Sequence, residues 1–423
     1  DVYKRQSVSL ANAHRWLGGA ALAGRGVRAA LQIGADAVSE QLGRALPRTP
    51  EQLARADVVN RLLSTAAPAS GRALPPVESV SLSGVDFESS NCINFLVDLD
   101  FGARSATEAG SGALPKTAYV KLPCAERTTR IFANAMGFWP LECLFCEQVA
   151  HQVPIRVPRV YAVAQRGSRF ALLLENLHET PGARLFINRD MAAGTTPERA
   201  ERVLDAFAEM HAHFWAWPDA AREALLPERF NTYTSPGWRG ITRALNAMAI
   251  EPARRAAPEL VTDEVAATCH LAIERWDEMI ESWYAWPRTL CHGDSHLGNC
   301  FEYPTDEGLR VGMIDFQAVH WAPGMRDVQY FLINSLEPDV LASHEEALIR
   351  GYCASLAERG IELGFDDAFS QYRAFSYQTL MVGVVPLGLA ALTERDETVL
   401  AITRRSTAAV ARLGLRDWIA GLR

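Results

Sequence analysis

Residues 290–299 read LCHGDSHLGN, and residues 311–317 read VGMIDFQ. In the first stretch, Asn299 follows Asp294 by five residues. In the second stretch, Asp315 stands at the end of an apolar, strand-like run and is followed by a phenylalanine. The spacing between the stretches fits one β-hairpin. Together they supply two carboxylates and one carboxamide to the same part of the chain.

These groups match the requirements for transferring a phosphoryl group from a nucleotide to a hydroxyl. One carboxylate must accept the proton of the attacking hydroxyl, while a carboxamide oxygen and a second carboxylate hold Mg²⁺ on the phosphates. Protein kinases use H-R-D-x-x-x-x-N and D-F-G for this purpose. The interval from Asp294 to Asn299 equals the kinase interval, and Asp315 begins an Asp-Phe pair. The pattern therefore predicts Mg²⁺·ATP-dependent phosphotransfer.

The two motifs resemble the signature of the aminoglycoside phosphotransferase and choline kinase superfamily, H-G-D-x-x-x-x-N followed by I-D-F/W. Within that superfamily, the stretches ECLF, LLLENL, HAHFW and IDFQ…RDVQYFL look most like the ecdysteroid-kinase-like branch. The resemblance covers about residues 48–415. It implies a two-lobed, protein-kinase-like fold with a β-rich N-lobe and a mainly helical C-lobe.

The resemblance also implies roles for individual residues. Asp294 matches the catalytic base, and Asn299 and Asp315 match the Mg²⁺ ligands. His292 matches a structural residue of the catalytic loop, and Asp327 matches an acid that supports this loop. The residues that match ATP-binding positions are Lys121 for the α- and β-phosphates, Glu142 as its ion-pair partner, and Glu175, Asn176 and Leu177 as the hinge whose backbone contacts adenine.

Lys121 is conspicuous on its own. The sequence uses arginine for nearly all its basic charge, and its lysines are Lys4, Lys116 and Lys121. A lysine inside the apolar strand pattern TAYVKL must find an anionic partner or lose its charge. We expect Glu142, on the next helical pattern, to be that partner. Glu147 is the alternative, because sequence fixes helix boundaries only to within a few residues.

The loop that would cover the phosphates departs from the usual pattern. Such a loop is normally rich in glycine, which lets backbone amides approach the phosphate oxygens. Residues 84–91 read GVDFESSN instead, with one glycine and two acids. We expect Ser89, Ser90 and Asn91 to bind the phosphates, with Glu88 pointing away from them.

The chain is too long for one typical domain, at 423 residues. Strand patterns precede helical patterns, which indicates the α+β class. We expect a helical extension and linker over residues 1–70, an N-lobe over 71–177 and a C-lobe over 178–423. The extension would contain a helix over 10–46 and a second helix that ends near residue 64. The N-lobe would begin with a strand over 77–82 and contain a helix over 142–150. The C-lobe would hold the catalytic loop (290–300), the metal motif (313–317) and the acceptor pocket.

Composition excludes several other classes of protein. The net charge of −8 argues against a nucleic-acid-binding protein held by phosphate contacts. The eight cysteines are scattered, so we expect a reducing, cytoplasmic location and no disulfide scaffold. The longest apolar run, 380–392, is too short to cross a bilayer, so no integral membrane segment is expected. The basic, acid-poor first 35 residues resemble a transit peptide but fit a surface helix better. The sequence gives no oligomeric state.

Other interpretations use the same residues. Residues 293–297, GDSHL, come close to the nucleophile elbow G-x-S-x-G but lack its final glycine. A kinase scaffold can also serve for binding alone. We favour a kinase because only this interpretation explains Asn299, Lys121 and the Asp-Phe pair, and because every charged catalytic position is filled. A hydrolase site for Zn²⁺ or Fe²⁺ would instead comprise His292, Asp294, His296, Asp315 and His320.

Some cysteines and histidines are expected to serve in packing. Cys143 and Cys146 form a C-x-x-C pattern, which can bind metal or act in redox chemistry, but they lie in a helical pattern without a second cysteine pair. Buried, unreactive thiols are the expected outcome. Cys291 and Cys300 are also expected to serve in packing, and His211 and His213 are expected to serve in helix packing and not in catalysis.

The acceptor is expected to be a small-molecule hydroxyl. Only eleven residues separate Asp315 from Asp327, which leaves no room for the activation segment with which protein kinases dock peptides. The pocket should come from residues 178–288 and the C-terminal helices. Aromatic residues there would suit a cationic substrate, as in choline or aminoglycoside kinases, or a flat apolar substrate. Alternatively, most of them belong to the hydrophobic core. The branch resemblance favours a bulky apolar alcohol. The aromatic residues are Trp215, Trp217, Trp238, Trp276, Trp283, Tyr284 and Trp286.

Overall fold

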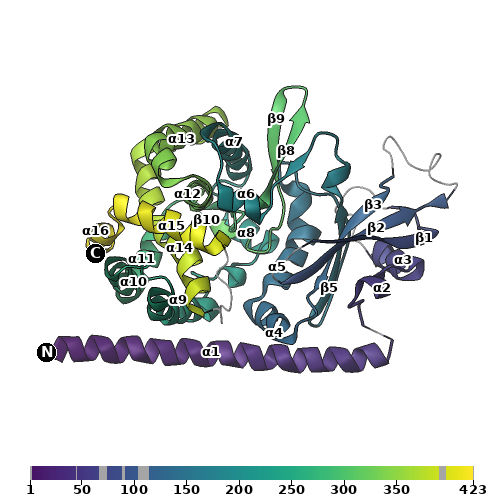
Figure 1. Ribbon diagram of the computed structural model, residues 1–423, viewed down its shortest axis with the longest axis horizontal. Helices are drawn as coiled ribbons and strands as arrows, with labels where there is room; N and C mark the ends of the chain where they lie inside the picture. Colours follow the sequence, from purple (N-terminus) through teal and green to yellow (C-terminus); the bar gives the residue numbers. More distant parts are fainter. Residues whose placement is uncertain are drawn as a thin grey trace. The chain divides into compact units, whose positions relative to one another are not determined.

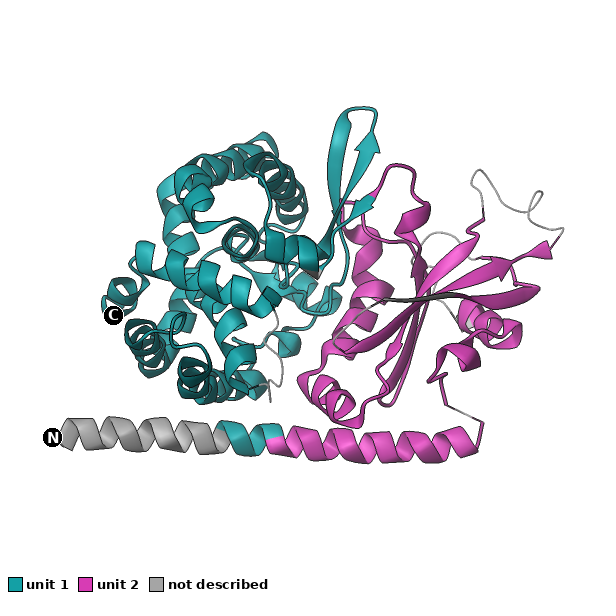
Figure 2. Cartoon of the chain, viewed as in Figure 1, with its two compact units in different colours: residues 1–22, 184–423 teal, residues 23–183 magenta. Residues whose placement is uncertain are grey.

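The computed structural model contains two compact units, residues 23–183 and residues 1–22 with 184–423 (Figure 2). The first unit is built around a β-sheet and the second is mainly helical. The expected α+β class is confirmed, and both the β-rich and the helical lobe of a protein-kinase-like fold are present. The structure describes residues 2–43, 45–65, 74–87, 91–102, 114–389 and 397–422.

A five-stranded antiparallel sheet forms the centre of the first unit, in the order β1-β2-β3-β5-β4 (Figure 1). Side chains along a strand alternate between faces, and Phe95, Val97 and Leu99 of β2 therefore enter one core with Val120 and Leu122 of β3. This alternation made the strands predictable. The strands are β1 (Ser79–Phe87), β2 (Cys92–Asp100), β3 (Thr117–Pro123), β4 (Val160–Arg166) and β5 (Arg169–Glu175).

The first strand is longer than its sequence suggested. The pattern predicted a strand over residues 77–82 and a phosphate loop from Gly84 onward, but β1 continues to Phe87. A register shift between Leu82 and Asp86 absorbs the extra residues, so pairing with β2 resumes beyond it. The prediction that the loop begins at Gly84 was therefore wrong.

The expected phosphate-binding residues fall at the edge of the described chain. Ser89 and Ser90 lie outside the described residues. Asn91 is described, and its backbone carbonyl accepts a hydrogen bond from the Cys124 amide at 3.2 Å. The role of all three residues stays a prediction.

The helices of the first unit differ in detail from the sequence pattern. The helix expected over residues 142–150 starts earlier and continues as a π-helical turn over Phe145–Val149. Glycine at position 137 adopts φ +78°, which ends one helix and starts the next. The helix expected near residues 51–64 is interrupted after Leu53. The helices are α2 (Pro50–Leu53), α3 (Ala56–Thr65), α4 (Arg127–Met136, not predicted) and α5 (Phe138–Leu144).

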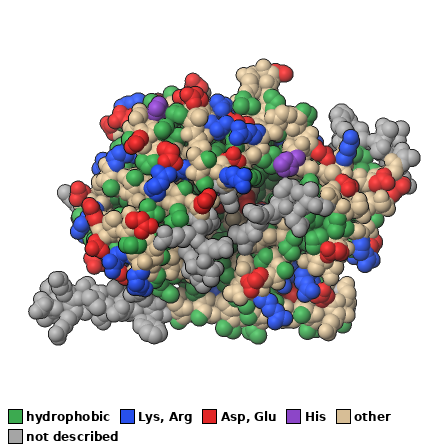
Figure 3. Space-filling view, viewed as in Figure 1, with side chains coloured by type: hydrophobic (Ala, Val, Ile, Leu, Met, Phe, Trp, Pro, Cys, Tyr) green, Lys and Arg blue, Asp and Glu red, His purple; other side chains and the backbone are tan. Residues whose placement is uncertain are grey.

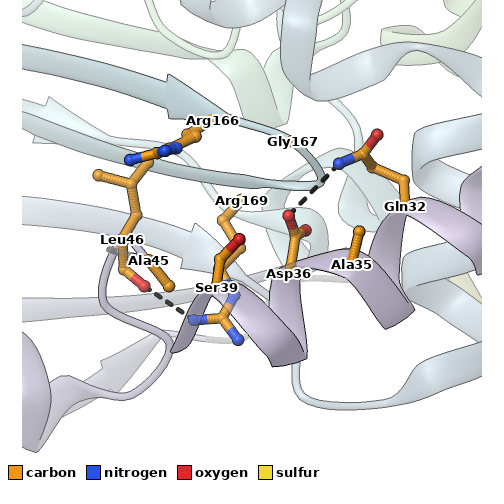
Figure 4. A pocket seen from close by; sticks show the side chains of 9 residues that line it. All are labelled: Gln32, Ala35, Asp36, Ser39, Ala45, Leu46, Arg166, Gly167 and Arg169. Atoms are coloured by element: carbon orange, nitrogen blue, oxygen red, sulfur yellow. Dashed lines mark hydrogen bonds between the residues drawn. The ribbon is translucent and has the colours of Figure 1, made fainter. Parts of the chain in front are cut away.

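The long helix α1 (Val2–Gln41) contacts the β4–β5 hairpin through its second half. The Asp36 carboxylate accepts a hydrogen bond from the Ser168 amide at 2.8 Å, and Arg169 pairs with Glu40 at 2.7 Å. A small pocket lies at this contact (Figure 4). The pattern predicted this helix over residues 10–46, but it ends at Gln41.

The helical unit surrounds the segment that carries the catalytic motifs. Thr196 caps α7 by accepting from the Arg199 amide, and Thr262 caps α10 in the same way. Among the described helices, none has the length and apolar character of a membrane span. The helices are α6 (Asn188–Ala193), α7 (Pro197–His213), α8 (Asp219–Leu225), α9 (Pro236–Ala256), α10 (Asp263–Glu274), α11 (Trp276–Trp283), α12 (Met325–Ser335), α13 (Pro338–Glu358), α14 (Phe365–Leu389), α15 (Glu397–Arg412) and α16 (Leu415–Ala420).

Short strands in the helical unit hold the motifs in place. One small sheet has the order β6-β8-β9, and β7 pairs with β10. On the face of the molecule in Figure 3, basic and acidic side chains are interspersed. The strands are β6 (Arg184–Leu185), β7 (Thr289–Cys291), β8 (Cys300–Thr305), β9 (Gly308–Met313) and β10 (His320–Ala322).

Candidate active site

The loop that carries Asp294 follows β7 and ends in a 3₁₀ turn over Leu297–Asn299. Gly293, in this loop, adopts φ +86°. A Cβ atom at this position would lie 2.0 Å from the backbone oxygen of Ala318. Only glycine satisfies both constraints, so the backbone of the segment just before β10 fixes the path of the loop.

The side chain of Asp327 holds the backbone of this loop. Its carboxylate is 0% exposed and accepts hydrogen bonds from the amides of His292, at 2.6 Å, and Gly293, at 3.0 Å. The His211 Nε2 atom lies 3.4 Å away. Burial alone would raise the pKa of Asp327, but His211 and Arg326 outweigh it and hold this pKa below its usual range. The loop therefore rests on an ionised, buried acceptor.

His292 connects the loop to the second motif. Its Nδ1 atom accepts from the Asp294 amide at 3.2 Å, and its Nε2 atom donates to the Ile314 carbonyl at 2.8 Å. Its ring lies 4.4 Å from the Phe316 ring, centroid to centroid. Burial lowers the pKa of His292, which favours the neutral imidazole that this bonding pattern needs. The imidazole thus bridges the two motifs.

Asp294 presents a partly exposed carboxylate, with 26% of the side chain accessible. Tyr330 Oη donates to its Oδ1 atom at 2.7 Å. The Oδ2 atom lies 3.3 Å from Asn299 Nδ2 and 3.6 Å from His296 Nε2. Burial would raise the pKa of Asp294, but His296 and Tyr330 outweigh it and keep this pKa below its usual range. An ionised carboxylate that reaches the surface can accept a proton from a hydroxyl.

The side chains of Asn299 and Asp315 suit a magnesium ion. The side-chain nitrogen Nδ2 of Asn299 donates to the Asp294 backbone oxygen at 2.8 Å. The side-chain oxygen of Asn299 is therefore the atom that would bind a cation. The Ile314 amide donates to the Asn299 backbone oxygen at 2.9 Å, and Asp315 follows directly. Asp315 has φ +64°, a strained conformation for a non-glycine residue that often marks functional sites. Carboxamide and carboxylate oxygens are ligands that Mg²⁺ accepts.

Tyr330 and the contact of His296 with Asp294 were missed from the sequence. A signal for Tyr330 did exist, because it follows Asp327 by three residues on α12 and so shares its helix face. His296 was considered only as a metal ligand. No comparable signal pointed to its place beside the Asp294 carboxylate.

In the β-rich unit, the partner of Lys121 is Glu142. Lys121 Nζ lies 2.5 Å from Glu142 Oε1, and the two side chains are 6% and 4% exposed. Strand β3 supplies the lysine and α5 supplies the acid. The alternative partner, Glu147, is exposed on the π-helical turn.

The side chains of the expected hinge residues are engaged in structural contacts. Glu175 accepts from Arg156 Nη2 at 2.5 Å. Asn176 donates to Thr117 Oγ1 at 2.8 Å, and its oxygen accepts from the His178 amide at 3.1 Å. These contacts shape the segment that leads into the 3₁₀ turn at Leu177. A role in adenine binding would therefore fall to the backbone, and it stays a prediction.

The geometry disfavours the competing interpretations. Ser295 is buried and donates to the Asp327 backbone oxygen at 3.1 Å, so it is not an exposed nucleophile. Cys143 and Cys146 are buried free thiols, and burial raises the pKa of the Cys143 thiol. The hydrolase interpretation named a different set of residues from the one that the structure brings together. Among the described residues, the potential metal-ligand atoms that lie within 4.8 Å of one another belong to His211, Cys291 and Asp327. The Asp327 carboxylate is already occupied by two backbone amides.

The aromatic residues of the helical unit divide into two groups. Trp238, Trp276 and Trp283 are buried. They belong to the core, as one of the open interpretations held. Trp215, Trp217, Tyr284 and Trp286 are only half-buried. Any aromatic contact with an acceptor would come from the second group.

Curated protein sequences gave no match. Solved structures with distant similarity include an ethanolamine kinase from Plasmodium vivax (12% identity, TM-score 0.46, 79% of this chain and 83% of that chain). A choline/ethanolamine kinase family protein from Mesorhizobium loti is similar at 14% identity (TM-score 0.42, 85% and 94%). The model of the ecdysteroid kinase-like family matches residues 140–365, more than half of the sequence. The chain therefore belongs to the ecdysteroid kinase-like family.

Proposed function

We propose that this protein is a Mg²⁺·ATP-dependent phosphotransferase that phosphorylates a hydroxyl group of a small molecule. The observation that carries the proposal is an ionised, surface-reaching Asp294 that is hydrogen-bonded to Asn299, which is in turn hydrogen-bonded to the residue before Asp315. Ile314 and His292 connect these groups through hydrogen bonds of 2.9 Å and 2.8 Å. Membership of the ecdysteroid kinase-like family supports the same chemistry.

In this proposal Asp294 is the general base. Its carboxylate accepts the proton of the acceptor hydroxyl as the hydroxyl oxygen bonds to the γ-phosphorus and the bond to the β-phosphate oxygen breaks. Asn299 and Asp315 would hold the metal ion, which neutralises charge on the phosphates when bound. His292 and Asp327 keep the loop in place and exchange no proton with the substrates.

Nucleotide binding in the β-rich unit would depend on Lys121. Its ammonium would contact the α- and β-phosphates, and Glu142 would orient it. The backbone of residues 175–177 would contact adenine. Ser89, Ser90 and Asn91 would cover the phosphates. In this scheme the N-lobe of residues 71–177 binds ATP, and the C-lobe of residues 178–423 binds the acceptor.

The short segment between Asp315 and Asp327 supports a small acceptor. It contains β10 and the start of α12, and no peptide-docking segment. A bulky, apolar alcohol is the proposed class, because the family resemblance favours it. The half-buried Trp215, Trp217 and Trp286 could instead surround a cation, as in aminoglycoside or choline kinases, and this is the second candidate.

The test is phosphoryl transfer by the purified full chain. Protein, Mg²⁺·ATP and pooled sterols, aminoglycosides, macrolides, choline and hydroxyacyl compounds are incubated together, and mass spectrometry detects phosphorylated products. The Asp294→Asn variant should lose transfer but retain nucleotide binding. Asp306→Asn, an exposed change in the β8–β9 turn, should behave as wild type. A wild-type protein that binds no nucleotide and makes no product would point to a binding protein on a kinase scaffold. Full transfer by Asp294→Asn would disprove the base assignment.

A further inference from the structure

One helix, α12, contacts successive residues of the catalytic loop. Arg326 Nη2 donates to the Gly293 backbone oxygen at 2.5 Å, and the Asp327 carboxylate accepts from the Gly293 amide at 3.0 Å. One turn further on, Tyr330 reaches the Asp294 side chain at 2.7 Å. The first two contacts hold the loop backbone. The third acts on the carboxylate itself, which suggests a separate task.

The hydroxyl of Tyr330 is held tightly and must act as a donor. The residue is 3% exposed, and the Arg326 guanidinium lies 4.7 Å from the centroid of its ring. The cation over the ring face and the surrounding core fix the ring orientation. Burial, together with the nearby Asp294 carboxylate, raises the pKa of Tyr330 well above its usual value, so the phenol keeps its proton.

The two oxygens of Asp294 are unequal. Oδ1 receives the short hydrogen bond from Tyr330, at 2.7 Å. Among the residues that the structure describes, Oδ2 has only longer contacts, 3.3 Å to Asn299 Nδ2 and 3.6 Å to His296 Nε2. Rotation about the last side-chain bond of an aspartate is soft, so an unrestrained carboxylate would exchange the two oxygens. The bond to Oδ1 removes that freedom.

We infer that Tyr330 is a positioning residue that holds the Asp294 carboxylate with Oδ2 directed to the acceptor hydroxyl. The inference rests on the proposed function. During transfer, the acceptor proton passes to Oδ2 while the new oxygen–phosphorus bond forms, and it later leaves Asp294 for water. Tyr330 keeps its own proton throughout and exchanges none with the substrates. Its contribution is orientation, since a reacting group must be aligned to be effective.

The test compares Tyr330→Phe with Tyr377→Phe in the purified full chain. Both residues are buried tyrosines of the helical unit, but the Tyr377 hydroxyl has no hydrogen-bond partner among the described residues. With the acceptor identified by the product screen, Tyr330→Phe should lower kcat about 10–100-fold, the range seen when a supporting residue is removed. The KM for ATP should stay within about twofold, because the nucleotide is bound by other groups. Tyr377→Phe should match wild type in both.

Two further variants separate positioning from general loosening of the fold. In an Asp294→Asn background, Tyr330→Phe should cause no further loss of residual transfer, because Tyr330 acts through Asp294. Incorporating 4-aminophenylalanine at position 330 retains an N–H donor and should restore most of kcat. Intrinsic fluorescence verifies folding. Wild-type kcat in Tyr330→Phe, or an undiminished effect of Tyr330→Phe in the Asp294→Asn background, would overturn the inference alone. Absence of transfer by the wild type would instead overturn the proposed function and the inference together.

Discussion

Replacing Asp327 by alanine should destabilise the helical unit and abolish transfer. The change removes the acceptor of two backbone amides, those of His292 at 2.6 Å and Gly293 at 3.0 Å, at a site with 0% exposure. An orphaned buried donor costs about 1–3 kcal/mol, so two cost about 4 kcal/mol of unfolding free energy. The nearby Arg326, 3.9 Å away, also loses its counter-charge, which adds to this loss.

Urea unfolding followed by tryptophan fluorescence measures this effect in the right part of the chain. Of the ten tryptophans, only Trp139 lies in residues 23–183, so the signal reports mainly the helical unit. Asp327→Asn retains one oxygen acceptor and should lose about half as much. The exposed Asp306→Ala change controls for removal of an acid and should leave the midpoint unchanged. A loss below about 1 kcal/mol in Asp327→Ala would refute the argument that buried amide satisfaction holds the loop.

Three further outcomes are expected. Burial lowers the pKa of His320 to about 4, so as the pH falls below about 6.5 the unfolded chain binds a proton that the folded chain does not. The free energy of unfolding should therefore drop by up to about 3 kcal/mol between pH 6.5 and pH 4. In urea titrations at a series of pH values, a His320→Asn variant should show a flatter pH dependence. Gly293→Ala should abolish transfer and destabilise the protein, because the new Cβ would lie 2.0 Å from a backbone oxygen. The control Gly351→Ala, in open space on α13, should raise the free energy of unfolding by about 0.5–1 kcal/mol. Equal effects of the two changes in thermal unfolding would contradict this. Glu142→Gln removes the charge that faces the buried Lys121 ammonium. This change should lower the free energy of unfolding by about 3–5 kcal/mol, measured by denaturation, and weaken ATP binding, measured by nucleotide titration. Unchanged stability would show that the pair is dispensable.

Much of the site could be predicted because its chemistry is local in sequence. The Asp294-to-Asn299 interval and the Asp315-Phe316 pair each lie within a few residues, so their spacing alone indicated the reaction. Lys121 could be paired with Glu142 because a lysine in an apolar strand demands an acid, and few acids lay on the next helix. These predictions depend on residue type and short spacing.

The rest depends on contacts between segments that are distant in sequence. Tyr330 and Asp294 are 36 residues apart, and their contact arises only when α12 packs beneath the catalytic loop. His211 reaches Asp327 across 116 residues, through α7. The shift in β1 register was missed for another reason. A bulge needs only a small local change in the backbone, and Gly84 looks the same in a loop and in a strand.

The complete burial of α12 has a consequence for how this protein responds to heat. All eleven of its residues, Met325–Ser335, are buried. The helix whose residues are all buried is also the one that holds the catalytic loop. Loosening the loop anchors requires opening this core, so the two events share one cooperative transition. Heat inactivation curves and unfolding curves of the helical unit should therefore superimpose, without an intermediate that is folded but inactive.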